Sequence, residues 1–157
     1  MPSRGAGVSN DQVDAVMRAS RALVGITAAS IADVDDRVTV PQLRVMMMIA
    51  TRGAMNLVAV AAGLGVSSPN ASRICDRLLK AGMLDRTEDP HDRRHVTLTL
   101  TSDGEALIDR VLRHRRTAIR KILRSLPSHL RDDVETVMNA FADAAGEPSE
   151  DWAQALM

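Results

Sequence analysis

The sequence predicts a mainly α-helical fold with one small β-hairpin. Apolar residues recur at helical spacing along most of the 157 residues. The clear exception is the segment 95–100, where apolar and polar residues alternate as they do in a half-buried strand. Hydrophobic residues make up 45% of the chain, which is enough for one core, so we expect a single domain with helical arms.

The first two predicted helices begin at capping boxes, in which a hydroxyl residue precedes a Gln by one helical turn. Ser9 and Gln12 open a helix within residues 9–32. Thr39 and Gln42 open the second helix, which carries an apolar stripe on one face. Both segments are therefore predicted to be amphipathic helices.

A short helix, a tight turn and another helix come next. Asn56 and Ser67 are suited to cap the two helices, and Gly65 supplies the permissive backbone for the turn between them. Gly82 stops the second helix of this pair. The positions of this helix that we expect to be buried are Ala71, Ile74, Cys75 and Leu78.

A β-hairpin then leads into the last two helices. Residues 84–88 and 95–100 form its strands, and the residues between them have turn chemistry. Ser102 and Glu105 predict a third capping box at the start of a long helix, and a further amphipathic helix follows Pro127.

The outer helices are apolar on one side but have few partners in so short a chain. We therefore expect residues 9–32 and 105–145 to form dimerisation helices around a central unit at residues 39–104, with 146–157 as a tail. Burial of these faces against a second copy would give a two-fold homodimer.

Composition limits the possible functions. The formal net charge is zero, yet binding to an anion depends on where the charges lie and not on their sum. Aromatic side chains are limited to Phe141 and Trp152, which argues against recognition of single strands by base stacking. No nucleophile–base pair or phosphate-binding glycine loop is present, so we expect neither an enzyme nor a cofactor.

The chain also lacks signals for export or membrane insertion. Its N-terminus has no apolar centre of a signal peptide, and we expect no membrane-spanning segment. The single Cys75 excludes an internal disulfide and fits a reducing compartment, so a cytoplasmic location is expected. The four His residues show no metal-ligand spacing, and no metal site is expected.

The second helix of the predicted pair carries a basic face. Arg73, Arg77 and Lys80 recur on one side of it. A helix of this kind suits the width of the DNA major groove, where Arg is a good partner for guanine and phosphate. Small polar residues near its start allow close approach to the bases, and they are Ser67, Ser68, Asn70 and Ser72.

The tip of the hairpin, Asp92-Arg93-Arg94, suits the narrower minor groove. The order and spacing of these parts resemble the winged helix-turn-helix of the multiple antibiotic resistance regulator (MarR) family of bacterial transcription factors. The recognition-helix pattern of that family appears here as Ser67 to Ser72 followed by Arg73-Ile74-Cys75-Asp76-Arg77-Leu78, and its wing pattern as Pro90, Asp92, Arg94, Leu100-Thr101 and Gly104.

The resemblance implies roles for individual residues. Arg94 would enter the minor groove, and Asp92 would fix its direction by a charge-assisted bond. We interpret Asp76 as a second positioning residue, because its spacing from Arg73 permits an ion pair that orients that Arg.

Regulators of this family commonly respond to small aromatic acids, drugs or oxidants. Cys75 is expected to be a buried structural residue, because it points into the domain. Met46 and Met47 belong to a Met run that would suit either an adaptable effector pocket or the core.

The long helix after the hairpin carries a second basic face, whose residues are Arg110, Arg113, Arg116, Arg120, Lys121 and Arg124. Three interpretations stay open. The face pairs with acidic residues of other helices, it contacts phosphate, or it holds an anionic effector through residues such as Arg113 and Arg120.

The sequence thus predicts a homodimeric transcription regulator, more specifically a repressor, that binds a pseudo-palindromic double-stranded operator. A small anionic or aromatic effector would release it. The alternative is a winged-helix adaptor that binds protein and not DNA. The charged recognition face and the Arg residues of the wing argue against that alternative.

Overall fold

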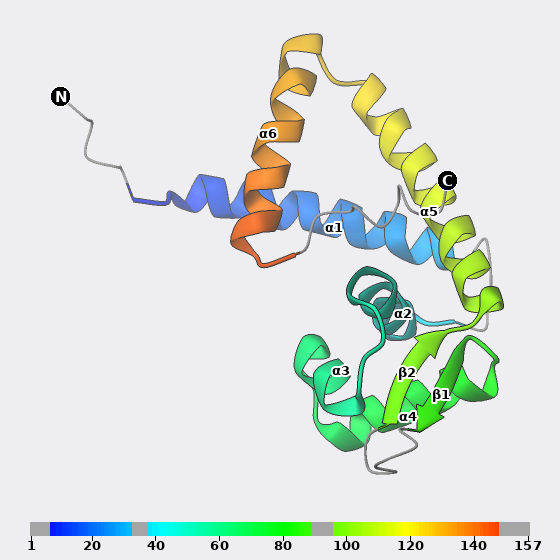
Figure 1. Cartoon of the computed structure of the whole chain (residues 1–157). Coiled ribbons are helices and arrows are strands. Elements are labelled where there is room, and N and C mark those ends of the chain that lie inside the picture. Colours follow the sequence, from blue (N-terminus) through cyan, green and yellow to red (C-terminus); the bar gives the residue numbers. More distant parts are fainter. Residues whose placement is uncertain (1–6, 33–37, 89–95, 148–157) are drawn as a thin grey trace.

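The computed structural model describes residues 7–32, 38–88 and 96–147 (Figure 1). In this part of the chain, the structure contains six helices and one two-stranded antiparallel sheet, as the sequence predicts. The elements in chain order are α1 (Asn10–Ala32), α2 (Val40–Arg52), α3 (Leu57–Leu64), α4 (Ser68–Lys80), β1 (Leu84–Glu88), β2 (Val96–Leu100), α5 (Ser102–Arg124) and α6 (Ser128–Ala144).

Local hydrogen bonds explain where the helices begin. The Ser9 amide donates to the Gln12 side chain at 2.9 Å, and the Thr39 amide donates to the Gln42 side chain at 2.8 Å, as in a capping box. The Asn56 side chain accepts from the Ala59 amide at 2.8 Å. These three predicted helix starts are confirmed.

The predicted cap of α5 is wrong by one residue. The N-cap is Thr101, whose hydroxyl accepts a hydrogen bond from the Gly104 amide at 3.0 Å, and Ser102 is the first helical residue. Both residues carry a hydroxyl, so the composition of the segment does not decide between them. The end of β2 at Leu100 decides, because it leaves Thr101 with the extended backbone that an N-cap requires.

The hairpin is fastened to the helices by a backbone bridge. Leu84 pairs with Leu100 at one end of the sheet and Glu88 with Val96 at the other. On the other side of β2, the Leu98 amide donates to the Met55 carbonyl at 2.7 Å, and the Met55 amide donates to the Leu98 carbonyl at 3.1 Å. This bridge ties β2 to the segment between α2 and α3, so the base of the hairpin has a fixed position beside the helix-turn-helix.

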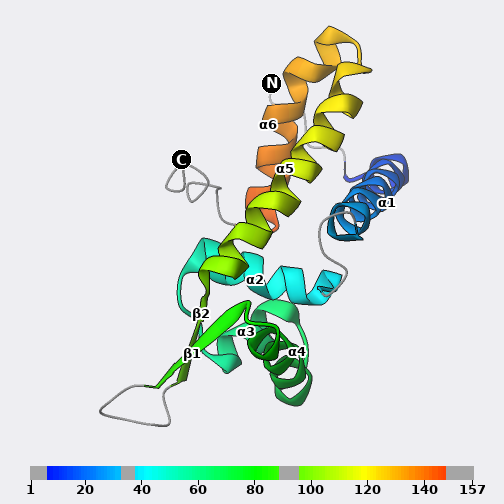
Figure 2. The same cartoon turned by 90° about the vertical axis from the view of Figure 1, so that its right-hand side faces the viewer.

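One hydrophobic core joins α2, α3, α4, the hairpin and the first half of α5. Its fully buried side chains include Met46, Val60, Leu78 and Leu107. Of the residues of α1, only Ser30 and Ile31 are buried, and α6 has no buried residue. Figure 2 shows α6 and the far end of α5 projecting away from the core, with α1 beside them.

Large apolar side chains are exposed on these projecting helices. On α1 and α6 they are Val13, Val16, Met17, Leu23, Val24, Leu130, Val137, Met138 and Phe141. The protomer therefore leaves apolar faces without a partner where the sequence predicts dimerisation helices.

The sequence predicts no membrane-spanning segment, but α1 meets one criterion for such a segment. Among the described residues, α1 alone is long and apolar enough to cross a bilayer, by length and composition only. Apolar side chains of its exposed face, such as Val16, Leu23 and Val24, contribute to its mean hydropathy of 1.2. The criterion is weak evidence for a membrane span, because a helix that buries an apolar face against another protein also meets it.

Gly104 marks a tight contact between the start of α5 and the end of the helix-turn-helix. It is buried, and a Cβ at this position would overlap the backbone carbonyl oxygen of Met83. Backbone atoms give way less readily than the end of a flexible side chain. We expect Gly104→Ala to lower the free energy of unfolding by about 1–3 kcal/mol, measured by urea denaturation. The control is Gly25→Ala in α1, where a Cβ meets no atom within 4 Å.

Candidate nucleic-acid interface

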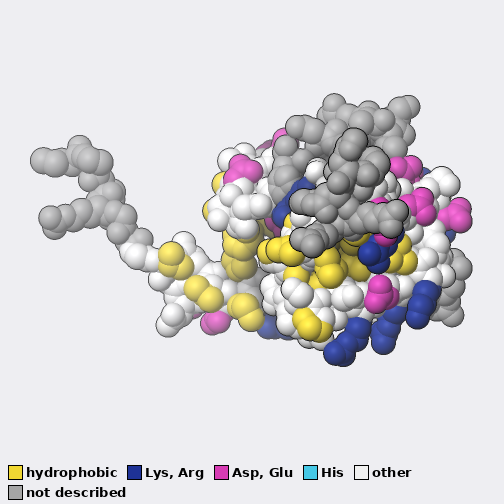
Figure 3. All heavy atoms as spheres, turned by 60° about the horizontal axis from the view of Figure 1, so that its bottom comes forward, with side chains coloured by type: hydrophobic (Ala, Val, Ile, Leu, Met, Phe, Trp, Pro, Cys, Tyr) yellow, Lys and Arg dark blue, Asp and Glu magenta, His cyan; other side chains and the backbone are white. Residues whose placement is uncertain are grey.

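The recognition helix α4 is anchored along one side and exposed along the other. Ala71, Cys75 and Leu78 are all at most 2% exposed and pack into the core. Arg73, Arg77 and Lys80 are exposed. Figure 3, which brings the α3–α4 end of the molecule forward, shows Lys and Arg side chains gathered on that surface. The helix therefore presents several cations from a rigid support.

The N-terminus of α4 is open for contact. Gly65 adopts a left-handed conformation with φ of 67°, which lets the chain turn tightly from α3 into α4. Ser67 is the N-cap, as predicted, but its hydroxyl makes no capping hydrogen bond. The first turn therefore keeps unpaired donors of the kind that bind phosphate. Ser67, Ser68 and Asn70 are exposed, whereas Ser72 is partly buried.

The predicted positioning role of Asp76 does not follow from this geometry. Asp76 is exposed on α4, and within the described ranges it forms no ion pair with Arg73 or Arg77. The spacing permits such a pair but does not enforce it, because both side chains gain more from water at an exposed site. Asp76 instead borders a cavity described below.

Asp92, Arg93 and Arg94, which the sequence assigns to the wing tip, lie outside the described residues. The strands β1 and β2 are described, and the end of the sheet at which Leu84 pairs with Leu100 lies close to the core. Leu84 and Leu98 are 2% and 4% exposed and hold the base of the hairpin against α4 and α2. The sheet thus starts from a fixed base next to the recognition helix.

The Cys75 thiol is expected to be unreactive. Burial, together with the negative charge of Asp76, raises the pKa of its thiol to about 11. Since the ordinary value is 9.0, the thiolate fraction at neutral pH falls about 100-fold. The Cys75 thiol is therefore protonated at neutral pH, as expected of a structural cysteine.

We expect Cys75 in the native protein to react with maleimide at pH 7.5 at least about 100-fold more slowly than in guanidinium chloride, because little thiolate is present and the sulfur is buried. The rate should rise as the pH approaches 11. We expect the Cys75→Ser variant to bind DNA as the wild type does. We also expect that peroxide does not release the wild-type protein from DNA. Release of the wild type but not of the Ser variant would contradict a structural role.

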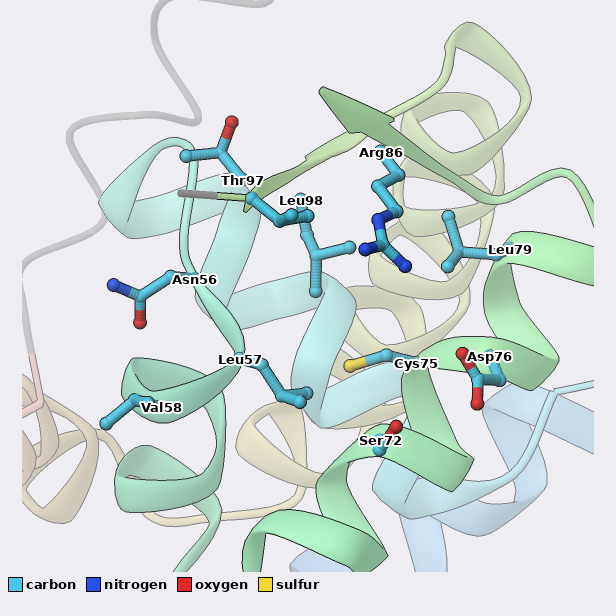
Figure 4. A pocket seen from close by; sticks show the side chains of 11 residues that line it. Asn56, Leu57, Val58, Ser72, Cys75, Asp76, Leu79, Arg86, Thr97 and Leu98 are labelled. Carbon is cyan, nitrogen blue, oxygen red and sulfur yellow. The ribbon is translucent and has the colours of Figure 1, made fainter. Parts of the chain in front are cut away.

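A cavity of about 490 Å³ lies between α3, α4 and the hairpin. Leu57, Cys75, Leu79 and Leu98 give it an apolar wall. Figure 4 shows Arg86 reaching into it from β1, with Asp76 on the opposite helix. A positively charged group above an apolar wall suits a small molecule that is apolar at one end and anionic at the other.

The residues predicted for an effector pocket do not border this cavity. Met46 is fully buried in the core, and Met47 is partly buried. Arg113 and Arg120 are exposed on α5, and among the described residues neither has an acidic partner within the protomer. Sequence reasoning missed Arg86, because only the pairing of β1 with β2 places it over α4.

The anchored recognition helix, the open N-terminus and the adjacent hairpin define a winged helix-turn-helix protein. The family model described as "MarR family" matches residues 38–96. A crystal structure of Rv1404 from Mycobacterium tuberculosis is similar over 92% of this chain and 99% of that chain, with 38% identity and a TM-score of 0.83.

Two further relatives extend the comparison. The transcriptional repressor MprA of Escherichia coli K12 is 30% identical over 88 residues, which are 56% of this chain and 50% of MprA. BpsR of Bordetella bronchiseptica is 26% identical, with coverage of 88% and 99% and a TM-score of 0.62. This chain spans about half the length of the curated relatives it matches.

The chain belongs to the MarR family. The curated relatives that name a function are transcription regulators and not enzymes, in agreement with the prediction from the sequence.

Proposed function

We propose that the protein is a homodimeric repressor that binds a pseudo-palindromic DNA site. The observation that carries this proposal is the exposed cationic face of α4, with Arg73, Arg77 and Lys80 opposite a buried anchor. In each half-site, α4 would lie in the major groove with Ser67, Ser68, Asn70 and Ser72 near the bases. Arg94 would enter the adjacent minor groove, supported by Arg93 and Asp92.

A mobility-shift assay on the DNA flanking its own coding sequence tests this function. We expect a complex that survives an excess of unrelated DNA in the wild type and is lost in the Arg73→Ala, Arg77→Ala double variant. The matched control is Arg110→Ala, Arg124→Ala, which removes the same charge from exposed positions of α5. Equal, weak binding of all three proteins would favour a winged-helix adaptor that binds protein.

The exposed apolar faces of α1 and α6 support the homodimer. Residues 9–32 and 105–145 would pack against their equivalents, and the two winged units at residues 39–104 would then meet two half-sites. Residues 146–157 are proposed as a tail outside this arrangement.

We propose that a small aromatic acid acts as effector and binds in the cavity beside Arg86. The structure of BpsR describes a mechanism for regulation of its DNA binding by 6-hydroxynicotinic acid. In this chain, Arg86 would pair with the carboxylate, while Leu57 and Leu98 would contact the ring. Because Ser72 and Asp76 of the recognition helix also border the cavity, an occupant would compete with DNA for this region.

Thermal shift with a panel of aromatic carboxylates tests the effector site. An Arg86→Met variant should lose the stabilisation, whereas an Arg113→Met, Arg120→Met variant should keep it. If the Arg113→Met, Arg120→Met variant loses the stabilisation and Arg86→Met keeps it, the effector binds instead in the region that the sequence suggests. That region comprises Met46, Met47, Arg113 and Arg120.

The basic face of α5 can be tested by the salt dependence of DNA binding. We expect Arg113→Ala, Arg120→Ala to leave the slope of log K against log salt unchanged and to lower dimer stability, because we expect both residues to pair with acidic residues inside the dimer. If both residues touch phosphate, the slope shrinks by up to about 2 units per protomer. A fluorescence anisotropy titration at four salt concentrations separates these results.

A further inference from the structure

The end of the recognition helix and the start of α5 are joined by backbone hydrogen bonds. After α4 ends at Lys80, the Met83 amide donates to the carbonyl of Leu78 at 2.9 Å. The carbonyl of Met83 accepts from the Thr101 amide at 3.1 Å. A continuous path of hydrogen bonds therefore connects the last turn of α4 to the N-cap of α5.

The Thr101 side chain adds two hydrogen bonds to this connection. We call the connection, from Leu78 to Met83 and from Thr101 to Gly104, the joint between α4 and α5. Its hydroxyl donates to the Gly82 carbonyl at 2.6 Å and accepts from the Gly104 amide at 3.0 Å. One oxygen thus holds the turn after α4 and the first turn of α5 at the same time. Gly104 lies so close to the Met83 carbonyl that the two segments have no room to slide past each other.

The joint connects the helix that carries the cationic face to the helix that leads to the projecting part of the molecule. On one side, α4 carries the cationic face, and on the other, α5 runs away from the core toward the projecting helices (Figure 2). Arg73 is about 12 Å along α4 from the joint, so a rotation of about 10° there moves it by roughly 2 Å. A displacement of that size exceeds the tolerance of a hydrogen bond to a base.

We propose that Thr101 is a positioning residue for DNA recognition, whose hydroxyl fixes the direction of α4 relative to α5 and thereby sets the half-site spacing that the dimer accepts. This inference rests on the proposed homodimeric DNA binding. In a two-fold dimer, the separation of the recognition helices must match the separation of the half-sites. A loosened joint lets each α4 turn independently of the dimer axis, so the penalty for a wrong spacing becomes smaller.

Three substitutions separate this role from simple helix capping. Thr101→Ser keeps both hydrogen bonds of the hydroxyl. Thr101→Asp keeps an acceptor for the Gly104 amide, but its carboxylate cannot donate to the Gly82 carbonyl. Thr101→Val removes both bonds while keeping the shape of the side chain. A residue that only caps α5 would tolerate Asp, because Asp is as good an N-cap as Thr.

The probe is a DNA duplex selected from a random library by the wild-type protein, together with the same duplex carrying one extra base pair between the half-sites. The measurement is the ratio of the two dissociation constants for each protein. Urea denaturation confirms that each variant is folded. If the Val variant does not fold, the comparison of Asp with Ser decides.

We expect the insertion to weaken the wild type and Thr101→Ser by roughly tenfold or more. For Thr101→Asp and Thr101→Val, this ratio should fall at least about threefold below that of the wild type. Equal ratios in all four proteins would overturn the inference and leave the proposed function intact. A ratio that falls in Thr101→Val but not in Thr101→Asp would do the same. Failure of the wild type to select any two-fold sequence would overturn both.

Discussion

Replacing Arg94 with Ala is expected to weaken operator binding more than any other single substitution in the chain. An Arg in a narrow minor groove gains from the concentrated negative potential there. Each such contact is worth about 1–3 kcal/mol, and a two-fold dimer carries two wings. The dissociation constant should therefore rise by roughly 30-fold to 20,000-fold, as measured by fluorescence anisotropy, with an unchanged circular dichroism spectrum.

The control for this result is Arg124→Ala. It removes the same charge from the far end of α5, which projects away from the recognition helix (Figure 1). We expect at most a small loss of affinity for the control. Wild-type affinity in Arg94→Ala would remove the wing from the mechanism. Equal losses in both variants would show that net charge, and not the groove contact, sets the affinity.

The second large effect is expected at the exposed apolar face of α6. Val137 and Phe141 are 61% and 52% exposed in the protomer, one turn apart. If this face is buried in the dimer, two buried carboxylates per protomer carry a desolvation penalty that the interface cannot offset. Val137→Asp, Phe141→Asp should therefore be monomeric at 10 µM in sedimentation velocity, whereas the wild type should be a dimer at all micromolar concentrations.

The chain offers a matched control on the same helix. Thr136→Asp, Asn139→Asp introduces the same charges on the opposite, exposed face of α6 and should remain dimeric. A folded wild-type monomer at micromolar concentration would contradict the homodimer directly. A dimer in the Val137, Phe141 variant would assign the interface to other surfaces.

The sequence predicts the fold well because the signals for its elements are local. The caps at Ser9, Thr39 and Asn56, the turn at Gly65 and the alternation near Leu98 depend on residues within one turn or one hairpin. The class of fold and the exposure of Arg73, Arg77 and Lys80 follow from them. The pattern of apolar residues also predicts which side of α4 is buried.

What the sequence does not predict depends on where separate elements meet. The hydroxyl of Thr101 bonds to Gly82, far away in sequence, so no local pattern indicates the joint. Arg86 borders the cavity only because β1 and β2 pair over α4. Conversely, the sequence spacing permits an ion pair between Arg73 and Asp76 that the described residues do not form. A permitted spacing at an exposed site does not specify a contact.

The buried, protonated thiol of Cys75 makes the chain convenient for single-molecule work. Cys75 is the one cysteine in the sequence, and its slow reaction means that it need not be removed before labelling. A new cysteine at exposed Ser68 would carry a fluorophore on each recognition helix. Energy transfer between the two dyes of a dimer would then report the separation of the recognition helices in solution, with and without DNA or a bound acid.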